Sequence, residues 1–207
     1  MDKPAPVDHP IEEVLRRRWS PRAFAPTVAE REKLLRLFEA ARWAPSSNNE
    51  QPWRYVIATA DDPALLDAAR SVLSPSNAWA TKVPILVCVV ARTTWTKDGT
   101  PNRHGVYDTG QATGHLLVQA TALGLFCHQM AGFDVEKARQ VFAVPEGHEP
   151  VAMLAIGYYG DSSTLEERRR QQEVAPRTRR PISEFVFTGR FGVPWGGPHL
   201  TPGRPAR

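Results

Sequence analysis

A nine-residue stretch near the start of the chain, RRRWSPRAF (residues 16–24), holds four arginines around one serine and contains no acid. Guanidinium groups bind phosphate through several hydrogen bonds at once, and a serine hydroxyl adds another donor. Arg18, Ser20 and Arg22 are therefore candidates to hold a compact phosphate group. A solvated basic helix end and a nucleic-acid surface are the alternatives, and the composition of the stretch alone slightly favours the solvated helix end.

Two further polar stretches could supply donors to the same kind of site. PSSNNEQPW (residues 45–53) is rich in small polar side chains, although an ordinary loop has the same composition. PRTRRP (residues 176–181) places Arg177 and Arg179 two residues apart, so their side chains point the same way if the segment is extended. A solvated basic linker is the alternative there. Together the three stretches could build a site for a phosphate-bearing cofactor.

The patterns of most other chemistries are missing from the chain. No GxGxxG follows a predicted strand, and there is neither a Walker loop nor a GxSxG elbow. The six histidines are scattered without an HxxxH pair, and Cys88 and Cys127 lie in apolar runs without metal-ligand spacing. We expect both cysteines to be buried, reduced thiols. Because neither a hydrolytic triad nor a metal site has support, any chemistry is expected to reside in a cofactor.

The composition is that of a folded, water-soluble domain. The 207 residues suffice for one domain with a substantial core, and 42% of them are hydrophobic and 23% charged. The net charge of +4 is mild for a nucleic-acid-binding protein. The start of the chain has no apolar signal-peptide core, and no apolar run approaches the roughly 18 residues that a membrane helix needs. We therefore expect a single cytoplasmic domain without nucleic-acid or membrane partners.

Hydrophobic periodicity and end signals predict alternating helices and strands. Thr27 and Glu30 form a capping-box pattern, Asp62 and Asp134 are expected helix caps, and Gly124 ends the longest helix. The alternation places the chain in the mixed α/β group. Helices are predicted over residues 11–18, 27–43, 62–72, 107–124, 135–142 and 164–173, and strands over residues 53–59, 84–91, 125–130 and 151–160.

Three segments carry no regular period. Residues 1–10 are expected to form a flexible leader. Residues 92–106 contain glycine and proline and are expected to form a mobile loop or lid. Residues 188–207 are rich in both and are expected to be a tail, or an arm over a partner. The folded domain is thus predicted to span residues 11–187.

Taken together and in this order, the polar stretches resemble the FMN-dependent nitroreductase family. The family's early Arg-x-Ser-x-Arg is matched by RWSPRAF (18–24), and its Ala-Pro-Ser-Ser-x-Asn-x-Gln-Pro-Trp by APSSNNEQPW (44–53). Its late pair of basic residues is matched by RTRRP (177–181), and ALGLFCHQMAGFD (122–134) is similar to the segment that faces the flavin ring. The resemblance covers about residues 11–187. It implies an α+β, three-layer sandwich with a central mixed sheet flanked by helices.

The resemblance also implies which residues bind FMN. Trp19 stands where relatives often have Arg or His, so only its backbone is expected to serve. The phosphate, the ribityl chain and the pyrimidine edge would be held by Arg18, Ser20, Arg22, Arg177 and Arg179.

A second set of residues would lie near the flavin ring. Asn77 would place an amide near the pyrimidine, and the backbone of Ala131 and Gly132 would place an N–H near flavin N5. The resemblance implies a homodimer with FMN sites at the subunit interface. The flavin bound mainly by the other subunit would be approached by Pro45, Ser46, Ser47 and Asn49.

The mechanism implied by the resemblance is ping-pong. NADH or NADPH delivers hydride to N5 of FMN, the nicotinamide leaves, and an acceptor such as a nitroaromatic or a quinone takes its place. No catalytic side chain is required, which agrees with the missing triads.

Other interpretations stay open. Relatives with the same fold fragment flavin or remove halogen from aromatic amino acids. The dehalogenating branch uses a lid with an acid, a tyrosine and a lysine, and residues 92–106 have Lys97 and Asp98 but no tyrosine before Tyr107. A protein that binds FMN without turnover and a nucleic-acid-binding module are the alternatives from other classes.

Overall fold

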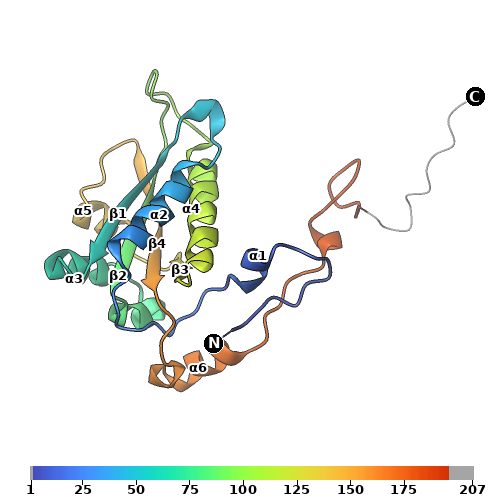
Figure 1. The fold of residues 1–207 in the computed structure, drawn as a ribbon. Helices are drawn as coiled ribbons and strands as arrows, with labels where there is room; N and C mark the ends of the chain where they lie inside the picture. The colour runs from blue at the N-terminus through green and yellow to red at the C-terminus, as the bar shows by residue number, and fades with distance from the viewer. Residues whose placement is uncertain (1, 196–207) are drawn as a thin grey trace, which may run out of the picture. The chain divides into compact units, whose positions relative to one another are not determined.

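The computed structural model of the protein describes residues 2–195 (Figure 1). The described residues form two compact units, one ending at Ala175 and the other beginning at Pro176. No helix in this part of the chain is both long enough and apolar enough to cross a membrane. Residues 196–207 of the predicted tail lie outside the described residues. The first unit contains α1 (Glu13–Arg17), α2 (Arg31–Arg42), β1 (Trp53–Thr59), α3 (Pro63–Ser71), β2 (Ile85–Arg92), α4 (Gly105–Ala122), β3 (Phe126–Met130), α5 (Val135–Val141), β4 (His148–Gly157) and α6 (Glu167–Val174), with short 3-10 helices η1 (Ser47–Asn49), η2 (Pro75–Lys82) and η3 (Ser162–Thr164).

The four strands form one sheet in the order β1-β2-β4-β3. All three pairings are antiparallel. The predicted α+β class is confirmed, but the described strands do not form the mixed sheet expected within it. Alternation of strands and helices does not determine strand direction, because a connection that contains a helix can bring the chain back in either sense.

Strand β2 separates the two halves of the hydrophobic core. Ile85, Val87 and Val89 belong to a cluster with α2 and α4, while Leu86 and Cys88 belong to a cluster with α3 and α5. Successive side chains of a strand point to opposite faces, which explains why this strand reads as a continuous apolar run. Figure 1 shows α2 and α4 on one side of the sheet and α3 and α5 on the other, the three-layer arrangement expected from the sequence.

Most of the predicted helix ends are confirmed. Asp62 accepts a hydrogen bond from the backbone N–H of Leu65 at the start of α3, and Asp134 accepts one from Lys137 at the start of α5. Gly124 has a φ of +73°, the left-handed conformation that commonly follows a helix.

The capping box predicted at Thr27 and Glu30 is wrong. Helix α2 begins at Arg31, and no side chain caps it. Glu30 instead accepts a hydrogen bond from the Tyr158 hydroxyl at 2.5 Å, and Lys33 donates to the same hydroxyl at 2.6 Å. The bond from Tyr158 is the main reason why the pKa of Glu30 falls to about 2. A tertiary contact therefore occupies the carboxylate that the capping box would need.

The segment between β2 and α4, predicted to be a mobile loop or lid, has a regular hydrogen-bond pattern. Thr94 and Pro101 form a β-bridge, and the Trp95 N–H donates to the Thr100 carbonyl at 2.8 Å. We call residues 93–102 the β2–α4 hairpin.

Helix α4 begins at Gly105, slightly before the predicted start at residue 107. A Cβ atom at Gly105 would lie 2.1 Å from the carbonyl oxygen of Arg92. Only glycine therefore lets the helix begin this close to the end of β2.

Both cysteines are free and buried, as predicted. Burial raises the pKa of the Cys88 thiol to about 12 and also raises the pKa of the Cys127 thiol. Both groups are therefore protonated, unreactive thiols at neutral pH.

The second unit is described as far as Trp195 and contains one 3-10 helix, η4 (Ile182–Glu184). After η4 the chain turns back on itself, because the Trp195 N–H donates to the Val186 carbonyl at 2.9 Å. The rings of Phe187 and Phe191 lie 4.8 Å apart within this turn.

Replacing Leu116 with alanine tests the core between α4 and the sheet. Leu116 is fully buried, whereas Leu35 on α2 is 53% exposed. We expect Leu116→Ala to lower the free energy of unfolding by about 2–5 kcal/mol, and Leu35→Ala to change it by less than about 0.5 kcal/mol. Urea unfolding of both variants measures the difference, and equal effects would contradict the described packing.

Candidate functional site

The stretch that carries Arg18, Ser20 and Arg22 is an extended segment with alternating burial. Trp19 and Ala23 are 6% and 1% exposed, whereas the three predicted phosphate-binding residues are half-buried or exposed. Because side chains alternate between the faces of an extended segment, these three residues share one face. Arg18 Nη1 donates to Ser20 Oγ at 3.3 Å. The structure therefore brings Arg18 and Ser20 into contact and places Arg22 on the same, less buried side of the segment.

Core contacts hold the segment from behind. The Trp19 ring lies 6.0 Å from the ring of Phe126 and 5.6 Å from that of Tyr159. The side chain of Trp19 is thus part of the core, which leaves its backbone for the predicted contact. Its indole N–H is buried and has no acceptor within residues 2–195. Such an unpartnered donor is uncommon in folded proteins.

A cavity of about 190 Å³ lies beside Arg22. Three basic side chains and one acid line it, and two stacked aromatic rings 6.0 Å apart form an apolar wall. Burial lowers the pKa of Arg22, and the nearby positive charge of Arg169 lowers it further. The buried Nε of Arg22 has no partner in the described part of the chain. The cavity is therefore electropositive, and the lining residues that matter here are Arg22, Phe24, Trp79, Lys82, Glu166 and Arg169.

The structure also brings the predicted residues Asn77 and Gly132 together. Asn77 Nδ2 donates to the Gly132 carbonyl at 2.8 Å, and the Trp79 indole N–H donates to Asn77 Oδ1 at 3.3 Å. A Cβ atom on Gly132 would lie 2.6 Å from Ser74 Oγ and 2.9 Å from Asn77 Nδ2, so a larger residue would have to displace these side chains. The preceding residue, Ala131, is exposed.

The predicted loop over residues 45–51 has an unusual backbone. Asn48, Asn49 and Gln51 have φ values of +53°, +54° and +50°, in the left-handed region that most side chains avoid. Backbone strain of this kind persists only where surrounding contacts enforce it, and it is common at functional sites.

Two hydrogen bonds enforce the shape of this loop. The N–H of Ser47 donates to Asp108 Oδ2 at 3.0 Å, and the N–H of Gln51 donates to Ser46 Oγ at 3.0 Å. Asp108 lies in the first turn of α4 and is only 2% exposed. The buried carboxylate therefore anchors the loop, while Pro45 stays exposed.

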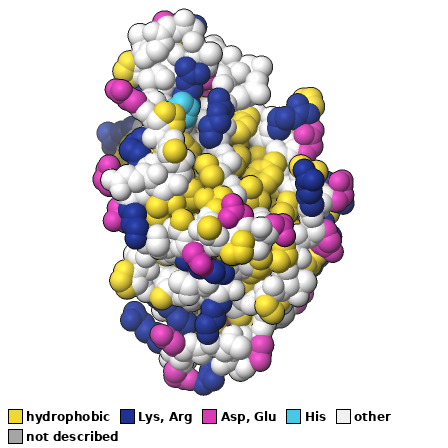
Figure 2. Space-filling model, turned by 90° about the vertical axis from the view of Figure 1, so that its left-hand side faces the viewer, with side chains coloured by type: hydrophobic (Ala, Val, Ile, Leu, Met, Phe, Trp, Pro, Cys, Tyr) yellow, Lys and Arg dark blue, Asp and Glu magenta, His cyan; other side chains and the backbone are white. Residues whose placement is uncertain are grey.

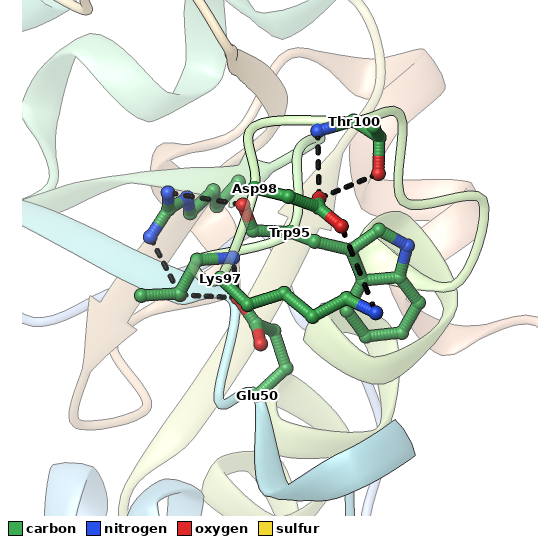
Figure 3. A network of polar contacts seen from close by, with 7 residues as sticks. Glu50, Trp95, Lys97, Asp98 and Thr100 are labelled. Atoms are coloured by element: carbon green, nitrogen blue, oxygen red, sulfur yellow. Dashed lines mark hydrogen bonds and ion pairs between the residues drawn. The ribbon is translucent and has the colours of Figure 1, made fainter.

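Glu50 connects this loop to the β2–α4 hairpin (Figure 3). Its Oε1 accepts hydrogen bonds from the backbone N–H of Thr96, at 2.6 Å, and from the Thr96 hydroxyl. Arg92 Nη1 donates to the same hydroxyl at 2.7 Å. The hydroxyl bond from Thr96 is the main cause that lowers the pKa of Glu50.

His128 on β3 supports the extended segment from a second direction. Its Nδ1 lies 2.8 Å from the Pro21 carbonyl oxygen and donates a hydrogen bond to it, and its ring lies 4.6 Å from that of Trp79. Burial lowers the pKa of His128 to about 4, and the positive charge of Arg22 contributes. The imidazole is therefore neutral at physiological pH.

The late basic pair, Arg177 and Arg179, belongs to the second compact unit. Both lie in a segment without helix or strand, in which Arg179 Nη1 donates to the Thr178 carbonyl at 2.8 Å. Their assignment to the set that holds the phosphate, the ribityl chain and the pyrimidine edge of FMN stays a prediction.

Sequence reasoning missed several residues that build the site. Glu173 and Arg169 lie in a run of charges typical of a solvated helix, and Asp108 looks like an ordinary acid in a first helical turn. His128 stood among scattered histidines with no motif. None of the four carried a local signal, because each acts through a contact with a distant part of the chain.

Comparison with known proteins places these features in context. A sequence profile described as the nitroreductase family matches residues 15–158. A solved structure described as an oxidoreductase containing FMN is 32% identical, with a TM-score of 0.85, over 91% of this chain and 96% of that chain.

Two curated bacterial proteins are also similar to this chain. An uncharacterised 15.4 kDa protein from Mycolicibacterium smegmatis is 38% identical over 58% of this chain and 78% of its own length. A protein from Xanthomonas oryzae pv. oryzae, provisionally named NADH dehydrogenase/NAD(P)H nitroreductase, is 27% identical over 75% of this chain and 87% of its own length.

The buried imidazole predicts how stability depends on pH. The pKa of His128 is about 4 in the native state and about 6.5 in the unfolded chain, so acid favours unfolding. The contribution of neutral His128 to the free energy of unfolding is fully present above about pH 6.5. It is lost as the pH falls toward 4, a difference of about 3 kcal/mol. Urea unfolding should show a shallower acid loss in His128→Gln than in the wild type. His115→Gln, at an exposed position, should keep the wild-type slope, and equal slopes in all three proteins would refute this role of His128.

Removing the charge of Glu50 should loosen the β2–α4 hairpin. We expect backbone amide exchange at Thr96 to become about 10-fold faster in Glu50→Gln, because the N–H loses a charged acceptor. Nuclear magnetic resonance measures this rate, with Glu149→Gln at an exposed position of β4 as the control. Unchanged exchange at Thr96 would show that Glu50 does not hold the hairpin.

Proposed function

The chain belongs to the nitroreductase family, and we propose that it is an FMN-dependent oxidoreductase that uses NADH or NADPH to reduce nitroaromatics, quinones or similar acceptors. The observation that carries this proposal is that Arg18, Ser20 and Arg22 lie on the less buried side of one segment and that Arg22 lines an electropositive cavity. The similarity to an FMN-containing oxidoreductase supports the cofactor. The name of the Xanthomonas relative supports a nicotinamide donor.

The residues present fit FMN. Guanidinium and hydroxyl donors suit its phosphate and ribityl oxygens. The unpartnered Nε of Arg22 is a buried donor that a ligand could satisfy. When bound, FMN would supply the chemistry of ping-pong electron transfer from the nicotinamide to the acceptor.

We assign the residues of this chain to binding and electrostatics. Arg18 and Ser20 would bind the phosphate and ribityl chain, and Arg22 and Asn77 the pyrimidine edge. The guanidinium of Arg22 would stabilise negative charge at that edge, since fixed charges act strongly where water is excluded. The amide of Asn77 is already oriented by its bonds to Gly132 and Trp79. No side chain needs to form a covalent bond or to act as a general base.

We also propose a homodimer in which the strained loop approaches the flavin of a second copy, through Pro45, Ser46, Ser47 and Asn49. Trp43, just before this loop, is 71% exposed, and Tyr107, next to Asp108, is 67% exposed. Exposed aromatic rings of this size are typical of protein interfaces. Figure 2 views the molecule from the side of α3 and α5 and shows that hydrophobic side chains also gather among charged ones on that face.

The reductive dehalogenase alternative has less support. Asp98 pairs with Lys97 at 3.6 Å and accepts from the Thr100 hydroxyl at 2.6 Å (Figure 3). These two charges therefore engage each other rather than presenting a matched set for a zwitterionic amino acid. A cytoplasmic location is proposed as well, and the two buried, unpaired thiols support it.

The absorbance spectrum of the purified protein tests the proposal. We expect a yellow protein whose flavin bands bleach when NADH or NADPH is added without air, and recover when a nitroaromatic or a quinone is added. Bound FMN that neither nicotinamide reduces would favour a non-catalytic flavin-binding protein. A colourless protein that takes up no FMN on titration would refute the proposal.

Reversing the charge of Arg22 tests the assignment of the site. We expect Arg22→Glu to weaken FMN binding by about 100-fold or more, because a charge-assisted contact becomes repulsive. Arg36→Glu, at an exposed position of α2, should bind like the wild type. Full FMN occupancy in Arg22→Glu would show that this residue lies outside the cofactor site.

A further inference from the structure

Glu173 is buried within a helix that otherwise looks solvated. Helix α6 has the sequence ERRRQQEV, and Glu173, at 1% exposure, is the one buried residue in it. Burying a carboxylate is unfavourable unless hydrogen-bond donors or cations compensate for the lost water. The partners of Glu173 therefore indicate its role.

The carboxylate accepts hydrogen bonds from two consecutive backbone N–H groups in the extended segment. The N–H of Arg22 lies 2.9 Å from Oε1 and 3.0 Å from Oε2, and the N–H of Ala23 lies 3.0 Å from Oε1. Both donors are main-chain groups. The contact therefore fixes the position of the backbone and does not depend on the side chains of Arg22 and Ala23. Bonds from N–H groups to a charged acceptor are stronger than neutral ones.

Other elements hold the same residues from different directions. His128 on β3 donates to the Pro21 carbonyl, and the N–H of Gly160 donates to the Ala23 carbonyl at 3.0 Å. With the backbone held on three sides, the Arg22 side chain is the part of this residue that remains to face the cavity.

The charge of Glu173 also matters for Arg22. Burial and the positive charge of Arg169 both disfavour a charged guanidinium at Arg22, and Glu173 acts in the opposite sense. A lysine reinforces the arrangement, because Lys3 Nζ donates to the Glu173 carbonyl at 2.5 Å and lies 5.0 Å above the Trp19 ring. The end of α6 is thus linked twice to the segment that carries the candidate site.

We propose that Glu173 is a positioning residue of the cofactor site. It holds the backbone of Arg22 and Ala23 so that the Arg22 guanidinium is presented to an electron-rich edge of the cofactor, and it offsets the repulsion between Arg22 and Arg169. The inference rests on the proposed function, because it takes FMN as the group that Arg22 meets.

Three variants of the full chain test this role. Glu173→Gln keeps the size of the side chain and removes its charge, and Glu173→Ala removes the acceptor altogether. Glu167→Gln is the matched control, since Glu167 lies on the same helix, is exposed and pairs with Arg170. If Glu173 only filled space, glutamine would behave like the wild type.

The first measurement needs no cofactor. Amide exchange at Arg22 and Ala23, followed by nuclear magnetic resonance, should be about 10-fold faster in Glu173→Gln and faster still in Glu173→Ala. Exchange in the central strand β2 should stay unchanged, and Glu167→Gln should match the wild type throughout. Should the alanine variant fail to fold, the glutamine variant decides alone. Unchanged exchange at both amides in Glu173→Gln overturns the inference.

The second measurement is the dissociation constant of FMN. We expect it to rise about 10-fold in Glu173→Gln, since a misplaced Arg22 loses a charge-assisted contact. Faster exchange with an unchanged dissociation constant would overturn the positioning role. If the wild type itself takes up no FMN, the proposed function fails, while the exchange rates still decide whether Glu173 holds this backbone.

Discussion

The antiparallel pairing of β2 with β1 on one side and β4 on the other is the contact on which the rest of the first unit depends. Every residue of β2 before Arg92 is buried, so helices must cover both of its faces. The pairing places Trp53, at the start of β1, opposite Ala91, near the end of β2. The loop that precedes β1 and the hairpin that follows β2 therefore lie at the same end of this strand pair. Glu50 reaches Thr96 for this reason, although 46 positions separate them in sequence.

Strand β3, which pairs with β4, organises the other part of the candidate site. His128, within this strand, holds the Pro21 carbonyl, and Gly132, just after its end, receives the amide of Asn77. The segment around Pro21 and the segment around Asn77 lie far apart in the chain, and both are thus held by contacts with β3 or the residues just after it. A site supported in this way needs little rearrangement to meet a planar ligand.

Features that depend on neighbouring residues in the sequence were predicted correctly. The strand at residues 53–59 and the caps at Asp62 and Asp134 follow from side chains within a few positions, and each was found where expected. The family motif also singled out Arg18, Ser20 and Arg22, but their alternation with the buried Trp19 and Ala23 is seen only in the structure. Hydrogen-bond partners that are distant in the chain could not be predicted from the sequence. Glu30 accepts a hydrogen bond from Tyr158, 128 positions away, instead of forming the capping box. Glu173 accepts one from the N–H of Arg22, 151 positions away. Neither partner could be inferred before the sheet was assembled.

The left-handed backbone of Asn48, Asn49 and Gln51 also bears on how the molecule assembles. Asparagine enters that region more readily than most residues and glutamine rarely does, but a chain that enters it at three of four positions is uncommon. The loop can take this shape only once Asp108 is fixed on α4 and the N–H of Arg92 has met the Pro52 carbonyl, at 2.8 Å. Both supports belong to α4 and β2, elements outside the loop. Folding is therefore expected to finish here, so that a newly made chain completes its core before it acquires the surface with which it would recognise a cofactor.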